Sequence, residues 1–342
     1  MRKEEQNKKP VITDDEKFIR HVEDMIEPSD VSDLICISSL KKLLPSSVFK
    51  QILYKTSKKN PHIGFVIEPY CLFLFFKIRD LEKAQAMLPD RYKLMKSRVF
   101  ADEEPDYYFG MGVFNTKATT FWGSRLEVYL IAKDTASDIT SWIFLDILSN
   151  TIISHPAKGI TDPNTVKALY TTNSKGEVFL DFLKQKSHTG LSLKGKFTNG
   201  KLRPLEQDLW IMGNASVAFS RNYVKKGEDP FAVIFDPAEV KQALDIPVTD
   251  ITILSNTIVP DWADNTLVKA VCFPYAQHYI ADSPGLRTFV KDPDDMIIKY
   301  NALSEKPKLK TFCARGTKLQ LFLMTALSAL ANIILLMLLL NT

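Results

Sequence analysis

The chain has 342 residues, with 44 Lys and Arg against 40 Asp and Glu, which gives a formal net charge of +4 at pH 7. Its composition, 45% hydrophobic and 25% charged, is that of an ordinary folded protein, long enough for one large domain or two small ones. A nucleic-acid-binding protein would normally show a basic face supported by aromatic residues or a motif. This sequence shows none, so we expect no nucleic-acid partner.

Residues 1–60 are predicted to form a polar tail followed by amphipathic helices. The first twelve residues are polar and are expected to be disordered. Thr13 and Glu16 have the spacing of a capping box, and apolar residues then recur on one face as far as Ile26, so a helix begins here. A second helical stretch follows Pro45. Two alternatives remain open for this region: it packs on the domain, or it lies on a membrane surface.

Several segments then have the pattern of β-strands. Cys71 to Ile78 reads CLFLFFKI, a short apolar run. From Arg125 to Ala132 the side chains alternate between two faces, with Glu127, Tyr129 and Ile131 on one of them. Further strands are predicted at Tyr107–Phe114, Thr140–Leu148, Val178–Leu183, Gly190–Phe197, Leu209–Phe219, Phe231–Ile234, Thr249–Val259 and Leu267–Phe273.

Short helices are predicted between the strands. One begins at Asp80 and is stopped by Pro89, and another covers Pro237–Leu244 with proline in its first turn. Many strands, few helices and no alternating βα rhythm predict a mainly β (α+β) domain over residues 61–290, an antiparallel barrel or sandwich with helices on its rim. A basic linker is expected over residues 291–319.

Leu321 to Leu340 reads LFLMTALSALANIILLMLLL and carries no charge. A helix of that length spans roughly 30 Å, the thickness of the hydrocarbon layer of a bilayer. The alternative is a buried helix of a globular core, but such a helix normally keeps a polar stripe. We therefore predict a transmembrane tail anchor over residues 320–340.

The orientation of the predicted span follows from its flanks. Basic residues next to a span stay on the cytoplasmic side, and here they precede it. The N-terminal region has no apolar run, so no secretory signal is predicted. We expect a cytoplasmic main domain held by a single-pass C-terminal anchor. The basic residues that carry this argument are Lys306, Lys308, Lys310, Arg315 and Lys318.

One face of the predicted span carries small and polar residues: Thr325, Ser328, Ala329 and Asn332 fall at i, i+3, i+4 and i+7. Such a face lets two helices approach closely and form a hydrogen bond within the membrane. A homodimer through the span and a monomeric anchor with incidental small residues both remain open.

Several short motifs follow one another in a set order: Glu68-Pro69-Tyr70, a helix ending in Leu88-Pro89, the strand GSRLEVYLIAKD, a Pro-Ala-Lys-Gly turn at Pro156–Gly159, and Ile246-Pro247-Val248 before a strand. This order resembles the acetoacetate decarboxylase superfamily over about residues 63–282. The resemblance implies a closed antiparallel β-barrel with a few rim helices and a small apolar pocket inside.

The same resemblance implies a carbon–carbon lyase in which a pocket lysine forms a Schiff base with a small oxo acid. The family has two adjacent lysines after a proline, whereas this chain has Ala157 and then Lys158. Burial beside a second cation keeps such a lysine neutral enough to attack a ketone. Lys158 is therefore the candidate catalytic residue, with an ordinary turn lysine as the alternative.

Four further residues are candidates for ligand binding. Lys117 is expected near the pocket wall, where it could hold a carboxylate or simply be solvated. Arg125 and Glu127 share one face of a strand, so they either contact a ligand or pair with neighbours. His155, in the turn before Pro156, is either a proton shuttle or structural.

Two functions follow from these candidates. The first is a lyase that processes a small oxo acid through Lys158. The second is a non-catalytic binder or carrier of an apolar carboxylate or lipid-like ligand at the membrane surface. No cofactor is expected. Neither a disulfide framework nor a metal site is predicted, because the four cysteines include no CxxC pair and the five histidines are widely dispersed.

Overall fold

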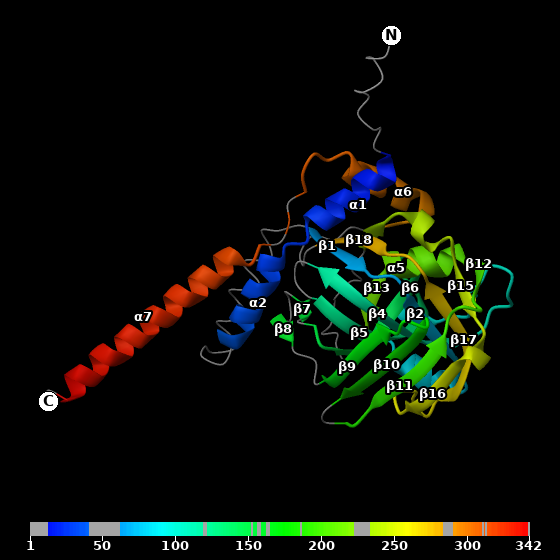
Figure 1. Ribbon diagram of the computed structural model, residues 1–342, viewed down its shortest axis with the longest axis horizontal. Coiled ribbons are helices and arrows are strands. Elements are labelled where there is room, and N and C mark those ends of the chain that lie inside the picture. Colours follow the sequence, from blue (N-terminus) through cyan, green and yellow to red (C-terminus); the bar gives the residue numbers. More distant parts are fainter. Residues whose placement is uncertain are drawn as a thin grey trace, which may run out of the picture.

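The structure is a computed structural model, and it describes residues 13–40, 62–118, 122–151, 153–155, 159–161, 165–184, 187–221, 233–282, 290–309, 311 and 313–340. Within these residues the chain forms a β-rich domain from which a long helix, α7 (Arg315–Leu340), extends (Figure 1). The mainly β prediction is confirmed.

Twelve of the described strands form the main sheet, whose hydrogen-bonded order is β12-β15-β17-β2-β4-β1-β18-β14, with β3, β5, β6 and β13 attached off this path. Their bounds are β1 His62–Ile67, β2 Cys71–Ile78, β3 Tyr92–Leu94, β4 Tyr108–Ala118, β5 Trp122–Asp134, β6 Ile139–Ser149, β12 Lys201–Pro204, β13 Val217–Phe219, β14 Val233–Phe235, β15 Gln242–Ile246, β17 Ala263–Phe273 and β18 Gln277–Asp282.

A second described sheet has the order β16-β11-β10-β9 and lies against the main one. Its strands are β9 Thr165–Thr172, β10 Glu177–Lys184, β11 Gly190–Lys196 and β16 Ile251–Asn256, and a small separate pair is formed by β7 Ile153–His155 and β8 Gly159–Thr161. The expected closed barrel is not found among the described strands. The main sheet branches at β4, because β1 and β2 share one of its edges while β5 takes the other.

The short helices lie around the sheets. They are α4 Leu81–Ala86, α5 Gly213–Ala215, the π-helix η1 Asp208–Met212, and the 3₁₀-helices η2 Pro237–Val240 and η3 Val248–Asp250. The Asp80 side chain caps α4 by accepting a hydrogen bond from the Lys83 backbone N–H at 3.1 Å, so this predicted helix is confirmed.

Two hydrophobic cores lie on opposite faces of β2. Phe73 and Phe75 belong to a core rich in aromatic rings, which we call the aromatic core, whereas Leu72, Leu74 and Phe76 belong to the core between the two sheets. Because both faces of this strand are buried, its sequence is a continuous apolar run rather than an alternating one.

Helices α1 (Asp14–Asp24) and α6 (Pro293–Ser304) cover one end of the main sheet (Figure 1). The rings of Phe18 in α1 and Tyr300 in α6 lie 4.6 Å apart, and the His21 ring contacts the Ser304 carbonyl oxygen at 3.1 Å. The expected capping box of Thr13 and Glu16 is present at the start of α1.

Three segments differ from the sequence prediction. The apolar stretch predicted as a strand over Leu209–Phe219 is mostly η1 and α5, whose apolar side chains are all buried and so give no helical period. Pro237–Leu244 divides into η2 and the start of β15. The expected linker contains α6, which begins at the capping residue Asp292 and buries Met296 and Tyr300.

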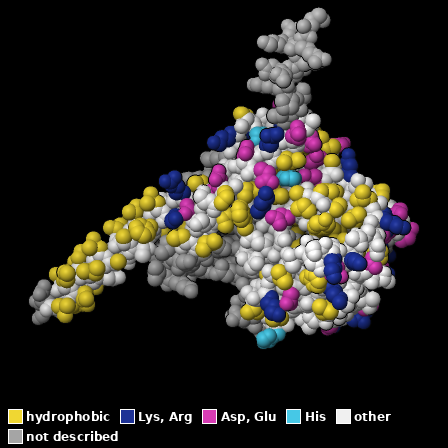
Figure 2. All heavy atoms as spheres, in the orientation of Figure 1, with side chains coloured by type: hydrophobic (Ala, Val, Ile, Leu, Met, Phe, Trp, Pro, Cys, Tyr) yellow, Lys and Arg dark blue, Asp and Glu magenta, His cyan; other side chains and the backbone are white. Residues whose placement is uncertain are grey.

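Near the N-terminus the structure adds a helix that was not predicted, α2 (Pro28–Leu40), while the helical stretch expected after Pro45 lies outside the described residues. At the other end, α7 has 26 residues and is long and apolar enough to cross a membrane. Its apolar side chains face outward along nearly its whole length, and charged side chains gather only at its start (Figure 2).

Candidate functional site

Three polar side chains lie in a row on one face of β5, at the border of the aromatic core. Arg125 Nη2 forms an ion pair with Glu127 Oε1, and the Tyr129 hydroxyl donates a hydrogen bond to Glu127 Oε2. The side chains of Arg125 and Glu127 are only 12% and 10% exposed. We call these three residues the Arg125 triad.

The neighbouring strand β4 leaves room for large rings beside the triad. Gly112 pairs with Glu127 and Gly110 pairs with Tyr129, so two of the three triad residues face glycines across the strand pair. A Cβ atom at Gly112 would lie 3.0 Å from the Phe73 ring, so the ring would have to shift to make room for it. The glycine therefore allows the Phe73 ring to lie across β4 toward the triad.

Large aromatic rings pack against one another beyond the triad. The Trp142 ring lies 5.1 Å from the Tyr129 ring and 5.7 Å from the Trp210 ring, and the Phe73 ring stands edge-on to Trp210 at 5.0 Å. Both indoles find hydrogen-bond acceptors: Trp142 Nε1 donates to the Leu209 carbonyl at 3.2 Å, and Trp210 Nε1 donates to that of Val99 at 2.9 Å. The triad thus borders an apolar, well-packed surface.

Burial controls the protonation of the groups around Glu127. It raises the pKa of Tyr129 well above its ordinary value, and the negative charge of Glu127 adds to this effect. The Tyr129 hydroxyl therefore stays protonated and donates to the carboxylate. Burial likewise raises the pKa of the Cys71 thiol, with smaller contributions from Cys272 and Glu127, so this thiol stays neutral.

The structure does not bring Lys117 to the triad. Lys117 lies an odd number of residues from Gly112 along the uninterrupted β4–β5 pairing, so its side chain leaves the opposite face of the sheet. There its ammonium group contacts both carboxylate oxygens of Glu23 in α1, at 3.0 Å each. Lys117 holds α1 on the sheet.

The remaining predicted residues lie at or beside Pro156–Gly159, where the sequence predicts a turn. Lys158 lies outside the described residues, and His155 is described only as the last residue of β7. No lysine in the described part of the chain is buried, so that part supplies no pocket lysine of the kind that a Schiff-base mechanism needs. Nor do the described residues contain a group of three or more His, Cys, Asp or Glu side chains that could hold a metal ion.

The pairing of Arg125 with Glu127 is one of the two alternatives that the sequence left open for them. Tyr129 was not predicted as a site residue, although the alternation in β5 already placed it on the same face as Glu127. The sequence did not indicate that Cys71 lies near this site, because a cysteine at the start of an apolar run is typical of an ordinary core residue.

No family model and no curated protein matches this sequence. Among solved structures, the chain is similar to the crystal structure of acetoacetate decarboxylase from Legionella pneumophila subsp. pneumophila str. Philadelphia 1. The two are 10% identical with a TM-score of 0.41, over 66% of this chain and 87% of that chain. Acetoacetate decarboxylase is also the family that the sequence motifs resemble.

Proposed function

We propose that this protein is a membrane-anchored domain that binds an apolar carboxylate or small oxo acid, with the Arg125 triad as the polar end of the site. The observation that carries the proposal is an ion pair between two side chains about nine-tenths buried, next to packed aromatic rings. Burying two charges costs several kcal/mol, and apolar residues of similar size often give an equally stable protein. Ligand recognition accounts for a pair that stability alone does not require.

The triad has the chemistry that a carboxylate or keto group requires. The planar guanidinium of Arg125 offers donors in a fork that matches a carboxylate, so a ligand would share it with Glu127. The protonated Tyr129 hydroxyl donates its one proton to Glu127, so it would hold that carboxylate in place beside the ligand. The apolar body of the ligand would then contact the aromatic core.

The membrane part of the proposal rests on α7. An uncharged apolar surface of this length is stable in the hydrocarbon layer of a bilayer and unfavourable in water. Arg315 and Lys318 in its first turn would lie at the level of the lipid head groups, and basic residues in that position favour a cytoplasmic domain. A carrier held at that surface would meet ligands that partition into the membrane.

The test compares ligand binding by matched variants of the full chain in detergent. The Arg125→Met/Glu127→Leu double variant removes the ion pair without leaving a lone buried charge. Lys184→Met/Asp146→Leu, which removes another partly buried ion pair joining the two sheets, is the control. The probes are acetoacetate and a medium-chain fatty acid, and the binding of each is measured by calorimetry.

We expect the triad variant to lose binding of at least one probe and the control to keep it. Equal binding by wild type and the triad variant would refute the assigned site. Borohydride reduction in the presence of acetoacetate addresses the lyase. A stable adduct on Lys158, lost in Lys158→Arg, would replace the binding function by Schiff-base catalysis.

A further inference from the structure

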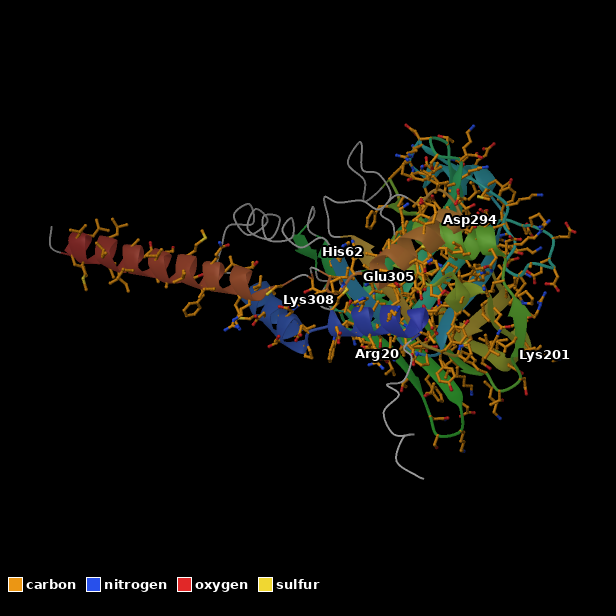
Figure 3. All side chains as sticks on the ribbon, turned by 90° about the horizontal axis from the view of Figure 1, so that it is seen from above. Arg20, His62, Lys201, Asp294, Glu305 and Lys308 are labelled. Carbon is orange, nitrogen blue, oxygen red and sulfur yellow. The ribbon has the colours of Figure 1, made fainter. Side chains whose placement is uncertain are left out.

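Helix α2 is attached to the start of α7 and to the residue before it by two polar contacts. Asp30 accepts a hydrogen bond from the Ala314 backbone N–H at 2.9 Å, and Lys318 Nζ lies 2.6 Å from Asp33 Oδ1. Asp30 and Ala314 are both buried at this junction. Figure 3 shows α2 in blue alongside the start of α7 in red.

The two contacts fix the relative direction of the helices. From Asp30 to Asp33 the partner advances from Ala314, just before α7, to Lys318 in its first turn, so the helices run parallel here. The part of α2 that follows Asp33 therefore lies beside the part of α7 that follows Lys318.

The residues beyond these contacts carry no charge on either helix. Residues 34–40 of α2 read LICISSL and extend the helix by ~10 Å. On α2, Ile35 is 53% exposed, and on α7 Leu319 and Phe322 are 60% and 65% exposed. The apolar surface of α7 therefore continues onto α2 at the same level.

We propose that residues 34–40 of α2 enter the lipid layer beside α7, so that the protein contacts the membrane through two helices. The proposal rests on the anchoring by α7 proposed above. Lys318 is the last charged residue before the uncharged run, which places it, and Asp33 paired with it, at the level of the head groups. Everything after Asp33 in α2 then lies at the depth of the acyl chains.

The ion pair between Asp33 and Lys318 allows α2 to enter the membrane to this depth. An acidic residue beside an anionic lipid surface is repelled, and the ammonium group of Lys318 neutralises Asp33 at that level. Arg315, exposed one turn earlier on α7, remains to attract anionic head groups. Because α2 follows α1, which packs on the main sheet, and is tied to α7 at Asp30 and Asp33, the domain cannot swing freely about a single span.

Native cysteines allow a direct test. Cys36 is exposed on the segment in question, Cys313 is exposed just before α7, and Cys71 and Cys272 are buried and stay in place. The full chain carrying Cys313→Ser is labelled at Cys36 with an environment-sensitive fluorophore. It is then reconstituted into vesicles of phosphatidylcholine and phosphatidylserine, with or without lipids bearing a doxyl quencher on the acyl chain.

Two reference proteins calibrate the signal: one labelled at Cys313 in a Cys36→Ser background, and one labelled at Leu327→Cys with both exposed cysteines replaced by serine. We expect the emission of a label at Cys36 to be blue-shifted and quenched by the doxyl lipids, as at position 327. The emission of a label at Cys313 should be neither shifted nor quenched. Quenching at 327 but not at Cys36 refutes the two-helix contact and leaves the anchor intact. No quenching at either position refutes the anchor itself.

A blue shift at Cys36 without lipid quenching would mean that a second copy of the chain covers α2, and this also overturns the proposal. Replacing Asp33 by lysine sets two ammonium groups against each other and should abolish quenching at Cys36 while leaving it at position 327. Asp24→Lys, an equal charge change on the exposed surface of α1, should leave both signals unchanged.

Discussion

Gly64 of β1 lies directly beneath Met25, the residue that caps the C-terminal end of α1. A Cβ atom built on this glycine would stand 2.9 Å from the Met25 Cβ and 3.0 Å from the Val22 carbonyl oxygen. The absence of a side chain therefore sets how closely α1 can approach the main sheet, and with it the position of Phe18 in the aromatic core.

The first prediction concerns this contact. Gly64→Ala should destabilise the domain by about 1–3 kcal/mol, because α1 must move away from the sheet or distort. Gly316→Ala is the control, since nothing lies within 4 Å of a Cβ atom there. Urea unfolding in detergent measures both. A Gly64→Ala protein as stable as the control would contradict the packing of α1.

The second prediction separates the two partners of the triad's ion pair. Arg125→Met leaves the Glu127 carboxylate buried without its guanidinium, and it should cost about 3–5 kcal/mol of folding stability. The Arg125→Met/Glu127→Leu double variant removes both charges and should regain most of that loss. If the double variant is less stable than the single one, the pair is needed for folding and its burial no longer supports ligand recognition.

The third prediction concerns Asp134, which is fully buried and accepts hydrogen bonds from Arg91 Nε at 2.6 Å, the Ser137 hydroxyl at 2.8 Å and the Ala136 backbone N–H at 3.0 Å. Burial alone would raise its pKa, but these bonds outweigh burial and hold the pKa below the ordinary value of 3.8. The stabilisation is therefore present above that ordinary value and is lost as the pH falls through the lowered pKa.

Asp134→Asn should lower stability by about 2–4 kcal/mol at neutral pH, and the gap to wild type should shrink below about pH 4. Asp138→Asn is the matched control: its side chain is 86% exposed, and asparagine accepts its positive φ of 60°. It should change stability by under ~1 kcal/mol. Thermal melts across the pH range measure this difference in stability. If the difference stays constant down to low pH, the charge of Asp134 does not stabilise the protein.

The fourth prediction concerns self-association of the span. Asn332→Leu should weaken dimers in detergent, because it removes a side chain that can form a hydrogen bond of roughly 1 kcal/mol between two helices. Cross-linking or analytical ultracentrifugation measures the dimer fraction, with Leu336→Ile, exposed one turn further along α7, as the control. The dimer hypothesis fails if Asn332→Leu leaves that fraction unchanged.

The sequence indicated the fold wherever one pattern dominated a segment. The apolar run at β2, the alternation in β5 and the capping box of α1 each have a local cause that single residues reveal. The π-helix η1 could not be found this way, because all its apolar side chains are buried and no period distinguishes it from a strand. Whether a sheet closes into a barrel depends on pairing between strands that are distant in the sequence, which no local pattern encodes.

For the candidate site, the sequence identified that Arg125 and Glu127 share a face, because alternation along one strand is a local property. It could not tell that the two residues pair with each other or that Gly112 lets the Phe73 ring lie across β4. Nor could it give the surroundings of Lys117, because the face of Lys117 depends on the register of β4 with β5 and its partner Glu23 is nearly a hundred residues away.

The contact between α1 and α6 imposes an order on how the protein is made. Phe18 leaves the ribosome early, but its packing partner Tyr300 is synthesised almost 300 residues later. Until then one end of the main sheet lacks its cover and exposes apolar surface to solvent. The last step of folding therefore nearly coincides with the emergence of the apolar helix α7, so a chaperone that recognises such a helix would meet a domain that has only just closed.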